Sequence, residues 1–354
     1  MVRSFSLLAG SALLAVACGS PPSAERTAST ASAIQDGQPD TTHTFVVGVL
    51  AQLGGGVSGL CSGTLLAPNL VVTARHCVAP PTDTTVDCGA AKFGPMVGAS
   101  QVDVVEAPTF DQTNPDPTSL VPVAEIMTPQ SQSLCGNDIA VLILGRSIQL
   151  AAYAEPSINP PMTDHSAYST SVTEIGYGLD SPTDMTSAGI RRIRENVGLV
   201  CIPNDSSFND CFSDSALKSA MSANEFQSGD GTCEGDSGSP AFDQKAADAG
   251  KWISFGVLSR GATQGSTCST AVYTRLDAWG SLLVSAANKA ATAGGYPVPA
   301  WTMTPVAVDT GGGPGSTKAN CGLAGGPARG TSSGAALALT ALAALGLRAR
   351  RRRR

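Results

Sequence analysis

The chain has 354 residues, of which 42% are hydrophobic, so it is long enough to bury a full core and is not expected to be disordered. Its 39 glycines and 23 prolines mark turns and break helix interiors, which favours strands and loops over a helical bundle. A net charge of -6 gives no support to a nucleic-acid partner, and the densest positive charge is an arginine run at the C-terminus.

The N-terminal residues 1–18 predict an export signal. Arg3 precedes an apolar run over 7–17, and small residues follow at a site typical of cleavage. The run Ala-Val-Ala-Cys at 15–18 resembles a bacterial lipoprotein box, although alanine stands where leucine is usual. The signal therefore indicates either lipidation at Cys18 or ordinary cleavage near Ala17. Residues 19–33 are small and polar, which predicts a propeptide or linker.

From residue 34 onward, short apolar and β-branched runs alternate with turn residues, which is typical of strands. These runs lie at 45–53, 64–74, 138–145, 171–178, 252–259 and 271–276. A helical spacing of apolar residues then predicts one helix over 276–290, carried by Leu276, Trp279, Leu282, Leu283 and Ala286. Strands followed by one terminal helix suggest an all-β protein of two barrels, with a folded domain over 34–290.

The C-terminal part is read as a linker and an anchor. Residues 291–333 are rich in Gly and Pro and lack periodicity, which predicts a linker. Residues 334–354 combine a short apolar run with an arginine tail, and the run is shorter than the roughly 20 residues of a permanent transmembrane helix. The order of spacer, Cys321, apolar run and basic tail resembles the C-terminal sorting tails of myxobacterial surface proteins. That resemblance implies cleavage and anchoring near Cys321; the alternative is a plain, marginal membrane anchor.

Three separated residues have the chemistry of a nucleophilic hydrolase. His76 follows the apolar run in TARHC, Asp138 begins another in GNDIAVLIL, and Ser237 lies in GDGTCEGDSGSP. A serine hydroxyl is a weak nucleophile at neutral pH, and imidazole is the side chain best suited to take its proton. A carboxylate is then needed to fix the imidazole tautomer and to stabilise its charged form.

Together these segments resemble the trypsin and chymotrypsin family of serine proteases, with His, Asp and Ser in the family's chain order. The similarity covers residues 34 to about 288 and includes CSGTLLAPNLVVTARHC, GDSGSP, GVLSRG and AVYTRL. It implies two six-stranded antiparallel β-barrels with a C-terminal helix. It also implies that His76 is the general base and acid, Asp138 its orienting carboxylate and Ser237 the nucleophile.

The same resemblance implies an oxyanion hole and a mode of activation. The oxyanion hole would be formed by the backbone N–H groups of Gly235 and Ser237. Activation would place a new N-terminal ammonium at Ile34 beside Asp236. The cut would fall after Ala33, so the activating protease is expected to cleave after a small residue.

Two positions depart from the family pattern. Ser239 stands where the second glycine of the serine motif is usual, and its β-carbon narrows the allowed backbone. Arg75 replaces the alanine that usually precedes the histidine, and its charge needs either solvent or an acid. Neither departure removes a catalytic group, but both put the exact geometry of the expected active site in question.

Eight of the ten cysteines are expected to form disulfides, with Cys18 and Cys321 set aside for the terminal signals. The family resemblance pairs Cys61 with Cys77 and Cys233 with Cys268. Four cysteines remain and allow three connectivities. Pairing within each barrel favours Cys88 with Cys135 and Cys201 with Cys211.

The resemblance places the base of the primary specificity pocket at Gly231, with walls near Gly261 and Ala271. A preference for Lys or Arg in the substrate needs a carboxylate at that base, which Gly231 lacks, so we expect a neutral pocket and a non-basic preference. The alternative is that Asp230 turns inward and restores basic specificity. Arg260 either adds positive charge along the cleft or is a solvated loop arginine.

Two other functional classes are alternatives to a protease. A catalytically silent surface binding protein would typically have lost a residue of the triad, which is complete here. A serine esterase of the α/β type needs the order Ser, Asp, His and a Gly-x-Ser-x-Gly elbow, which the sequence lacks. With no Cys-x-x-Cys or close histidine pair, no metal or other cofactor is expected. We expect an exported monomer that acts on protein or peptide substrates, held at the cell surface or outer membrane by its terminal anchors, or released.

Overall fold

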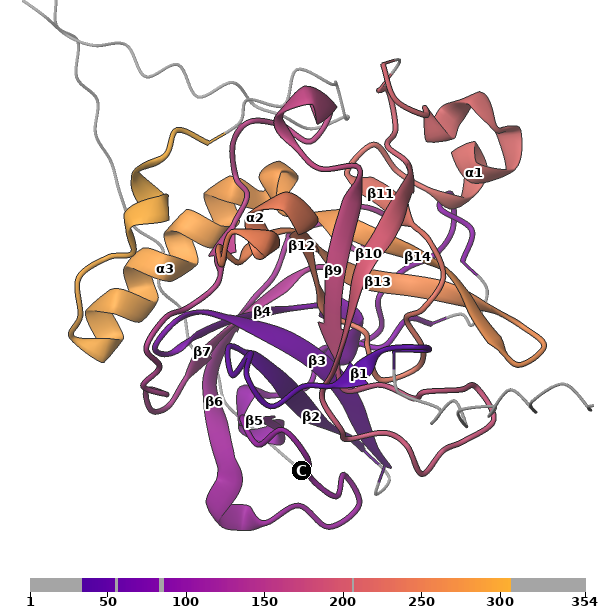
Figure 1. The fold of residues 1–354 in the computed structure, drawn as a ribbon. Helices are drawn as coiled ribbons and strands as arrows, with labels where there is room; N and C mark the ends of the chain where they lie inside the picture. The colour runs from indigo at the N-terminus through magenta and orange to yellow at the C-terminus, as the bar shows by residue number, and fades with distance from the viewer. Residues whose placement is uncertain (1–33, 55–56, 83–85, 206, 307–354) are drawn as a thin grey trace, which may run out of the picture. The chain divides into compact units, whose positions relative to one another are not determined.

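The computed structural model describes residues 34–54, 57–82, 86–205 and 207–306 (Figure 1). The predicted export signal, the propeptide and the C-terminal anchor lie outside these residues, as do Cys18 and Cys321. None of the helices within the described ranges has the length and apolar character that a membrane crossing requires.

The first half of the domain forms a closed barrel, drawn in indigo to purple in Figure 1. Its strands pair antiparallel in the order β2-β3-β4-β7-β6-β5 and back to β2. The bounds are β2 (Val46–Gly54), β3 (Val57–Ala67), β4 (Leu70–Thr73), β5 (Val102–Val105), β6 (Leu120–Met127) and β7 (Ala140–Leu144). The interior is filled by β-branched and aliphatic side chains, which suit a pleated and buried surface.

The second half closes in the same way, because β10 pairs with both β9 and β11. The ring continues through β14, β13 and β12 back to β9. The bounds are β9 (Ser171–Gly176), β10 (Arg192–Cys201), β11 (Glu225–Ser228), β12 (Pro240–Asp243), β13 (Ile253–Gln264) and β14 (Thr267–Arg275). Two short strands extend this sheet: β1 (Gln38–Pro39) pairs with β10, and β8 (Glu155–Pro156) runs parallel to β13. The predicted pair of six-stranded antiparallel barrels is confirmed.

The predicted C-terminal helix is also confirmed, as α3 (Gly280–Gly294). Its buried face, which includes Leu283, Ala286 and Ala290, belongs to the same core as the first barrel. The helix ends at Gly295, whose φ of 67° is left-handed and suits glycine. Trp301 is buried further on, so the segment predicted as a linker from residue 291 begins with residues that pack on the core.

The sequence did not predict several short helices. Two are α-helical, α1 (Ser215–Ala220) and α2 (Gln244–Asp248), and each is capped by the aspartate before it, Asp214 and Asp243. The 3-10 helices are η1 (Arg75–Cys77), η2 (Ala99–Gln101), η3 (Pro117–Ser119), η4 (His165–Ala167), η5 (Cys211–Ser213), η6 (Asp277–Trp279) and η7 (Ala300–Met303).

Four disulfides tie loops to the two barrels, and they are the four predicted pairs: Cys61–Cys77, Cys88–Cys135, Cys201–Cys211 and Cys233–Cys268.

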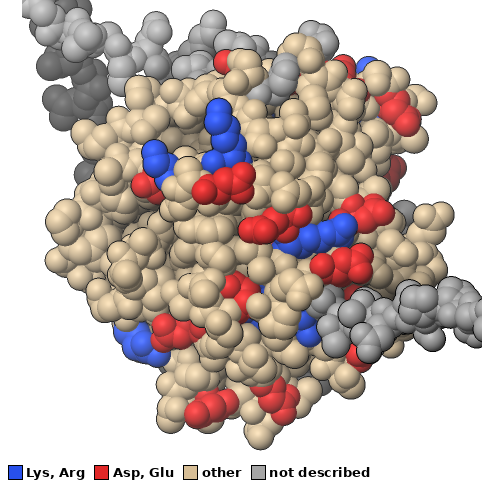
Figure 2. Space-filling model, viewed as in Figure 1, with Lys and Arg blue, Asp and Glu red and all other residues tan. Residues whose placement is uncertain are grey.

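On the face shown in Figure 2, acidic and basic side chains are interspersed over a largely uncharged surface.

Candidate active site

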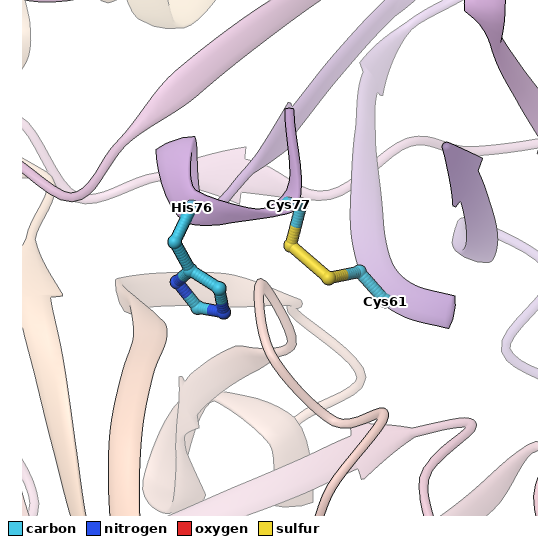
Figure 3. A group of neighbouring side chains, drawn as sticks. All are labelled: Cys61, His76 and Cys77. Carbon is cyan, nitrogen blue, oxygen red and sulfur yellow. A yellow bond between two sulfur atoms is a disulfide. The ribbon is translucent and has the colours of Figure 1, made fainter. Parts of the chain in front are cut away.

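His76 lies on the turn η1, which follows β4 directly. Its neighbour Cys77 is bonded to Cys61 on β3, so the turn is fixed to the barrel wall on both sides. Figure 3 shows the imidazole and the disulfide projecting side by side from this turn. The ligand atoms of these three residues lie within 4.8 Å of one another, but the sulfur atoms form a disulfide and offer no thiolate for a metal ion.

Asp138 is fully buried just before β7 and holds His76 at two points. Its Oδ2 lies 2.7 Å from His76 Nδ1, and its Oδ1 accepts the backbone N–H of His76 at 2.9 Å. Burial by itself would raise the pKa of Asp138, but the charge and hydrogen bonds of His76 lower it below the usual value. Burial would lower the pKa of His76, and Asp138 more than offsets this, so that pKa is raised.

Ser259 also binds the buried carboxylate, and sequence reasoning did not assign it a role. Its hydroxyl donates to Asp138 Oδ2 at 2.7 Å. Ser259 lies where the pairing of β13 with β14 shifts register between Leu258 and Arg260, and such a bulge re-aims a side chain. The only sequence signal was a polar residue that ends an apolar run.

Arg260 does not project into open solvent. Its guanidinium forms a two-point ion pair with Glu225, at 2.7 and 3.0 Å, and also donates to Ser259 Oγ at 3.1 Å. Glu225 is fully buried, and Arg260 retains 16% of its side-chain exposure. The charge considered for the substrate cleft is therefore paired internally, and neither sequence interpretation of Arg260 anticipated its partner.

Ser237 lies in a loop whose backbone requires glycine on both sides. Gly235 has φ of 94° and Gly238 has φ of 82°, a region that side chains rarely adopt. A β-carbon on Gly238 would lie 2.2 Å from Thr73 Oγ1 and 2.8 Å from Ala74 N. The serine loop of the second barrel therefore packs against the strand end of the first barrel that leads into His76.

Hydrogen bonds fix this loop through the Ser237 carbonyl and the Gly238 N–H, and they leave two other amides free. Ser62 N donates to the Ser237 carbonyl at 2.7 Å, and Gly238 N donates to the Leu258 carbonyl at 2.8 Å. In the described part of the chain, the N–H groups of Gly235 and Ser237 donate to no protein acceptor. A cleft of about 440 Å³ begins beside Gly235 and is lined in part by Leu60, Leu179 and Glu234.

Asp236 and Ile34 are both completely buried. The Asp236 carboxylate accepts the N–H groups of Gly178 and Cys233 at 2.8 and 2.9 Å. Burial raises its pKa to about 7. Gln35 N donates to the Gly231 carbonyl at 2.6 Å, which holds the start of the domain against the loop that contains Asp236.

The two departures from the family pattern are accommodated. Ser239 is buried, and its φ is not positive, so its β-carbon causes no backbone strain. Arg75 is buried and forms no direct ion pair in the described structure, although the charge of Asp138 acts on it: it donates to the carbonyls of Pro129 and Ser131 and to Gln132 Oε1. Its guanidinium also lies 4.2 Å from the centre of the Phe93 ring, a favourable cation–π arrangement.

The predicted pocket base lies at the junction of several strands. Gly261 on β13 pairs with Ala271 on β14, and Ala271 is fully buried. Asp230 is exposed, and its carboxylate accepts the Thr270 N–H at 3.0 Å. A β-carbon on Gly231 would lie 2.6 Å from Arg194 Nη1 and 3.4 Å from Glu174 Oε2. Arg194 and Glu174, both far from residue 231 in the sequence, were not predicted at this position; Glu174 is a single charge inside the apolar run SVTEIGYG.

Comparisons with known proteins agree with one another. The family model described as Trypsin matches residues 34–280. Ovochymase of Halocynthia roretzi is 27% identical over 238 residues, "Serine protease 41" of Homo sapiens is 27% identical over 227 residues, and a trypsin of Saccharopolyspora erythraea is 24% identical over 253 residues. These matches cover 64%, 62% and 70% of this chain and 13%, 66% and 95% of the relatives, so the chain spans less than two thirds of the first two.

The solved structures that match include a secreted serine protease, VesC, from Vibrio cholerae. It is 24% identical, with a TM-score of 0.46, and the match covers 69% of this chain and 46% of that chain.

Proposed function

The chain belongs to the trypsin family, and on that premise we propose that it is a serine endopeptidase that cleaves peptide bonds through an acyl-enzyme. The observation that carries the proposal is the buried Asp138 carboxylate, which lies 2.7 Å from His76 Nδ1 at the point where the Ser237 loop packs. Labelling by a fluorophosphonate probe tests it, because such probes react with an activated serine. If the processed protein is not labelled, the alternative of a catalytically silent surface binding protein is favoured instead.

The proposed mechanism follows from the tautomer that Asp138 selects. With Nδ1–H donating to Asp138, His76 Nε2 has a free lone pair and can take the proton of Ser237. The serine oxygen then attacks the peptide carbonyl, and the amides of Gly235 and Ser237 receive the developing negative oxygen. Each such donor contributes about 3 kcal/mol to the transition state. His76 next gives its proton to the leaving amine, and water repeats the sequence to release the acyl group.

The raised pKa of His76 predicts the acid limb of the activity profile. The reaction needs a neutral imidazole in the free enzyme, so kcat/KM for a neutral substrate should rise with pH. Because Asp138 raises the pKa above the usual 6.5, the midpoint of this rise is expected above pH 6.5. Measurement of kcat/KM from pH 4 to 9 with an uncharged peptide checks this. A midpoint well below 6.5 would contradict the dominance of Asp138 over burial.

We also propose that the protein is made as a zymogen and activated by a cut between Ala33 and Ile34. Asp236 is a buried carboxylate, and an ammonium at Ile34 would stabilise its charged form. Ile34 has φ of 42°, which is strained for a β-branched residue. That angle exists only while Ala33 is attached, so cleavage relieves the strain.

N-terminal sequencing tests the activation site. The fraction of protein that a fluorophosphonate probe captures is expected to begin at Ile34. Unprocessed protein is expected to react far more slowly, because its Asp236 lacks the ammonium partner. Full labelling of chains that begin well before or well after Ile34 would contradict the proposal.

Export is part of the same proposal. Four disulfides form and persist in oxidising compartments, which supports secretion through the predicted N-terminal signal. Attachment at Cys18 or near Cys321 concerns residues outside the described ranges and stays a prediction.

A further inference from the structure

We propose that the ion pair between Arg260 and Glu225 is a positioning device, which holds the Asp138 carboxylate against His76 from the second barrel. Arg260 lies on β13 and Glu225 on β11, whereas Asp138 comes just before β7 of the first barrel. The inference rests on the proposed peptidase activity and deepens it, because it adds two residues that act on the proposed base through Asp138.

The first line of contacts runs from Arg260 to Asp138 through one hydroxyl. Arg260 Nη1 donates to Ser259 Oγ at 3.1 Å, and that hydroxyl donates to Asp138 Oδ2 at 2.7 Å. The same Oδ2 lies 2.7 Å from His76 Nδ1. A hydroxyl has a single hydrogen, and the N–H that Ser259 accepts occupies one of its lone pairs. Arg260 therefore fixes the direction in which Ser259 donates to the carboxylate.

The second line of contacts runs from Glu225 to the backbone that carries Asp138. Glu225 Oε1 accepts the N–H of Gly136, two residues before Asp138, at 2.9 Å. Its Oε2 accepts the N–H of Ser222 at 2.7 Å. The two segments are tightly packed, because a β-carbon on Gly136 would lie 2.1 Å from Ser222 Oγ. Glu225 thus ties the loop before β7 to the segment that leads into β11.

The ion pair joins these two lines of contacts. Arg260 Nη1 and Nη2 lie 2.7 and 3.0 Å from Oε1 and Oε2 of Glu225, and Nη2 also donates to the Ala220 carbonyl at 2.6 Å. A planar guanidinium can bind a carboxylate at two points and still donate to a hydroxyl. Removal of either partner leaves the other charge buried and uncompensated. Both lines of contacts to Asp138 therefore depend on the intact pair.

The charges of the pair also act on the titration of His76. Burial lowers the pKa of the imidazole, Asp138 raises it by more, and Arg260 lowers it again. Glu225 carries the opposite charge beside Arg260. Arg75, the neighbour of His76 on η1, donates to carbonyls of the first barrel. Loss of the Arg260 charge should therefore raise the pKa of His76, and loss of the Glu225 charge should lower it.

The experiment compares processed wild-type protein with R260M, E225Q and the double variant, on an uncharged peptide. Both single variants are expected to lower kcat on the pH plateau about tenfold at unchanged KM, because the proposed base is less well held. The midpoint of the rise of kcat/KM with pH should move up by about half a pH unit in R260M and down by about as much in E225Q. The double variant lacks both charges, so its midpoint should return to about that of the wild type.

A matched control is R275M, which also removes an ion-paired arginine of the second barrel. Arg275 lies on β14, and its described side-chain hydrogen bonds go to Asp277 and to the Ala223 carbonyl. Its loss is expected to leave the pH midpoint at the wild-type value. A general loss of stability in the second barrel would move neither midpoint, so the opposite shifts in R260M and E225Q distinguish positioning from stability.

Two results would overturn the inference and leave the peptidase intact. One is wild-type protein that reacts with a fluorophosphonate, together with single variants that keep the wild-type kcat or whose midpoints move in the same direction. The other is a higher KM in R260M at unchanged kcat and midpoint, which would make Arg260 a substrate contact. Absence of any labelling of processed wild-type protein would refute the peptidase itself.

If a variant that removes a charge does not fold, R260K decides. Lysine keeps the charge but lacks the planar fork that bonds Glu225 and Ser259 together. A lower kcat in R260K at the wild-type midpoint supports the inference, and an unchanged kcat overturns it.

Discussion

Replacing Ser237 with alanine is expected to lower kcat/KM by about a million-fold and to abolish fluorophosphonate labelling. In the proposed mechanism, the hydroxyl supplies both the nucleophile and the proton that His76 takes. What remains is the modest acceleration from substrate binding and the oxyanion donors. Folding should be unaffected, because the described hydrogen bond that holds this residue in the loop, from Ser62 N, uses its carbonyl. The melting temperature of S237A should therefore match that of the wild type.

A matched control lies two residues away. Ser239 is buried, and its hydroxyl has no hydrogen-bond partner in the described structure, so S239A removes a serine without touching the proposed chemistry. S239A is expected to remain labelled. Labelling that survives in S237A would rule out Ser237 as the nucleophile, and a loss in both variants would show that the effect of S237A is not specific to the Ser237 hydroxyl.

Replacing Asp138 with asparagine is expected to lower kcat about ten-thousand-fold, although the two side chains have the same shape. Three donors converge on the carboxylate: the backbone N–H and Nδ1 of His76, and the Ser259 hydroxyl. An amide group has only one acceptor oxygen. The backbone N–H cannot reverse its role, so the oxygen must face it and the NH2 must face the imidazole. His76 then carries its proton on Nε2 and cannot take the proton of Ser237.

The measurement is kcat as a function of pH for D138N, compared with S259A. S259A removes one of the three hydrogen bonds and keeps the charge, so a loss of about tenfold is expected. A D138N enzyme that stays within tenfold of the wild type would show that the tautomer is not controlled by Asp138.

The sequence predicted those parts of the fold whose signal is local. The strands of the first barrel at 46–54 and 140–144 are continuous apolar runs that are buried in the structure, and the helix at 280–294 has a clear apolar face. Strands β10 and β11 were missed because their sequences, RIRENVGLVC and EFQS, are polar or charged in part and read as loops. Their pairing within the second barrel, rather than their own hydrophobicity, makes them strands.

The residues of the candidate site also fall into those that a local motif predicts and those that it does not. His76, Asp138 and Ser237 stand in motifs that carry their own flanking signals. Glu174 and Ser259 do not, because their partners are far away in the sequence: Glu174 bonds across its own sheet, and Ser259 bonds to Asp138 of the other barrel. The buried carboxyl group of Glu174 depends on hydrogen bonds from Ser228 and Tyr273, which lie on two other strands. No pattern within one segment can report such a convergence.

The hydrogen bond from Ser259 to Asp138 also affects when the enzyme can first act. The proposed base and its carboxylate belong to the first barrel, yet Ser259 and the Leu258 carbonyl that holds Gly238 come from β13, late in the chain. During synthesis, a chain that ends before β13 contains the base and the nucleophile but lacks the groups that fix both. With the proposed mechanism, a growing or truncated chain therefore cannot cut itself or its neighbours until nearly all of the second barrel has been made.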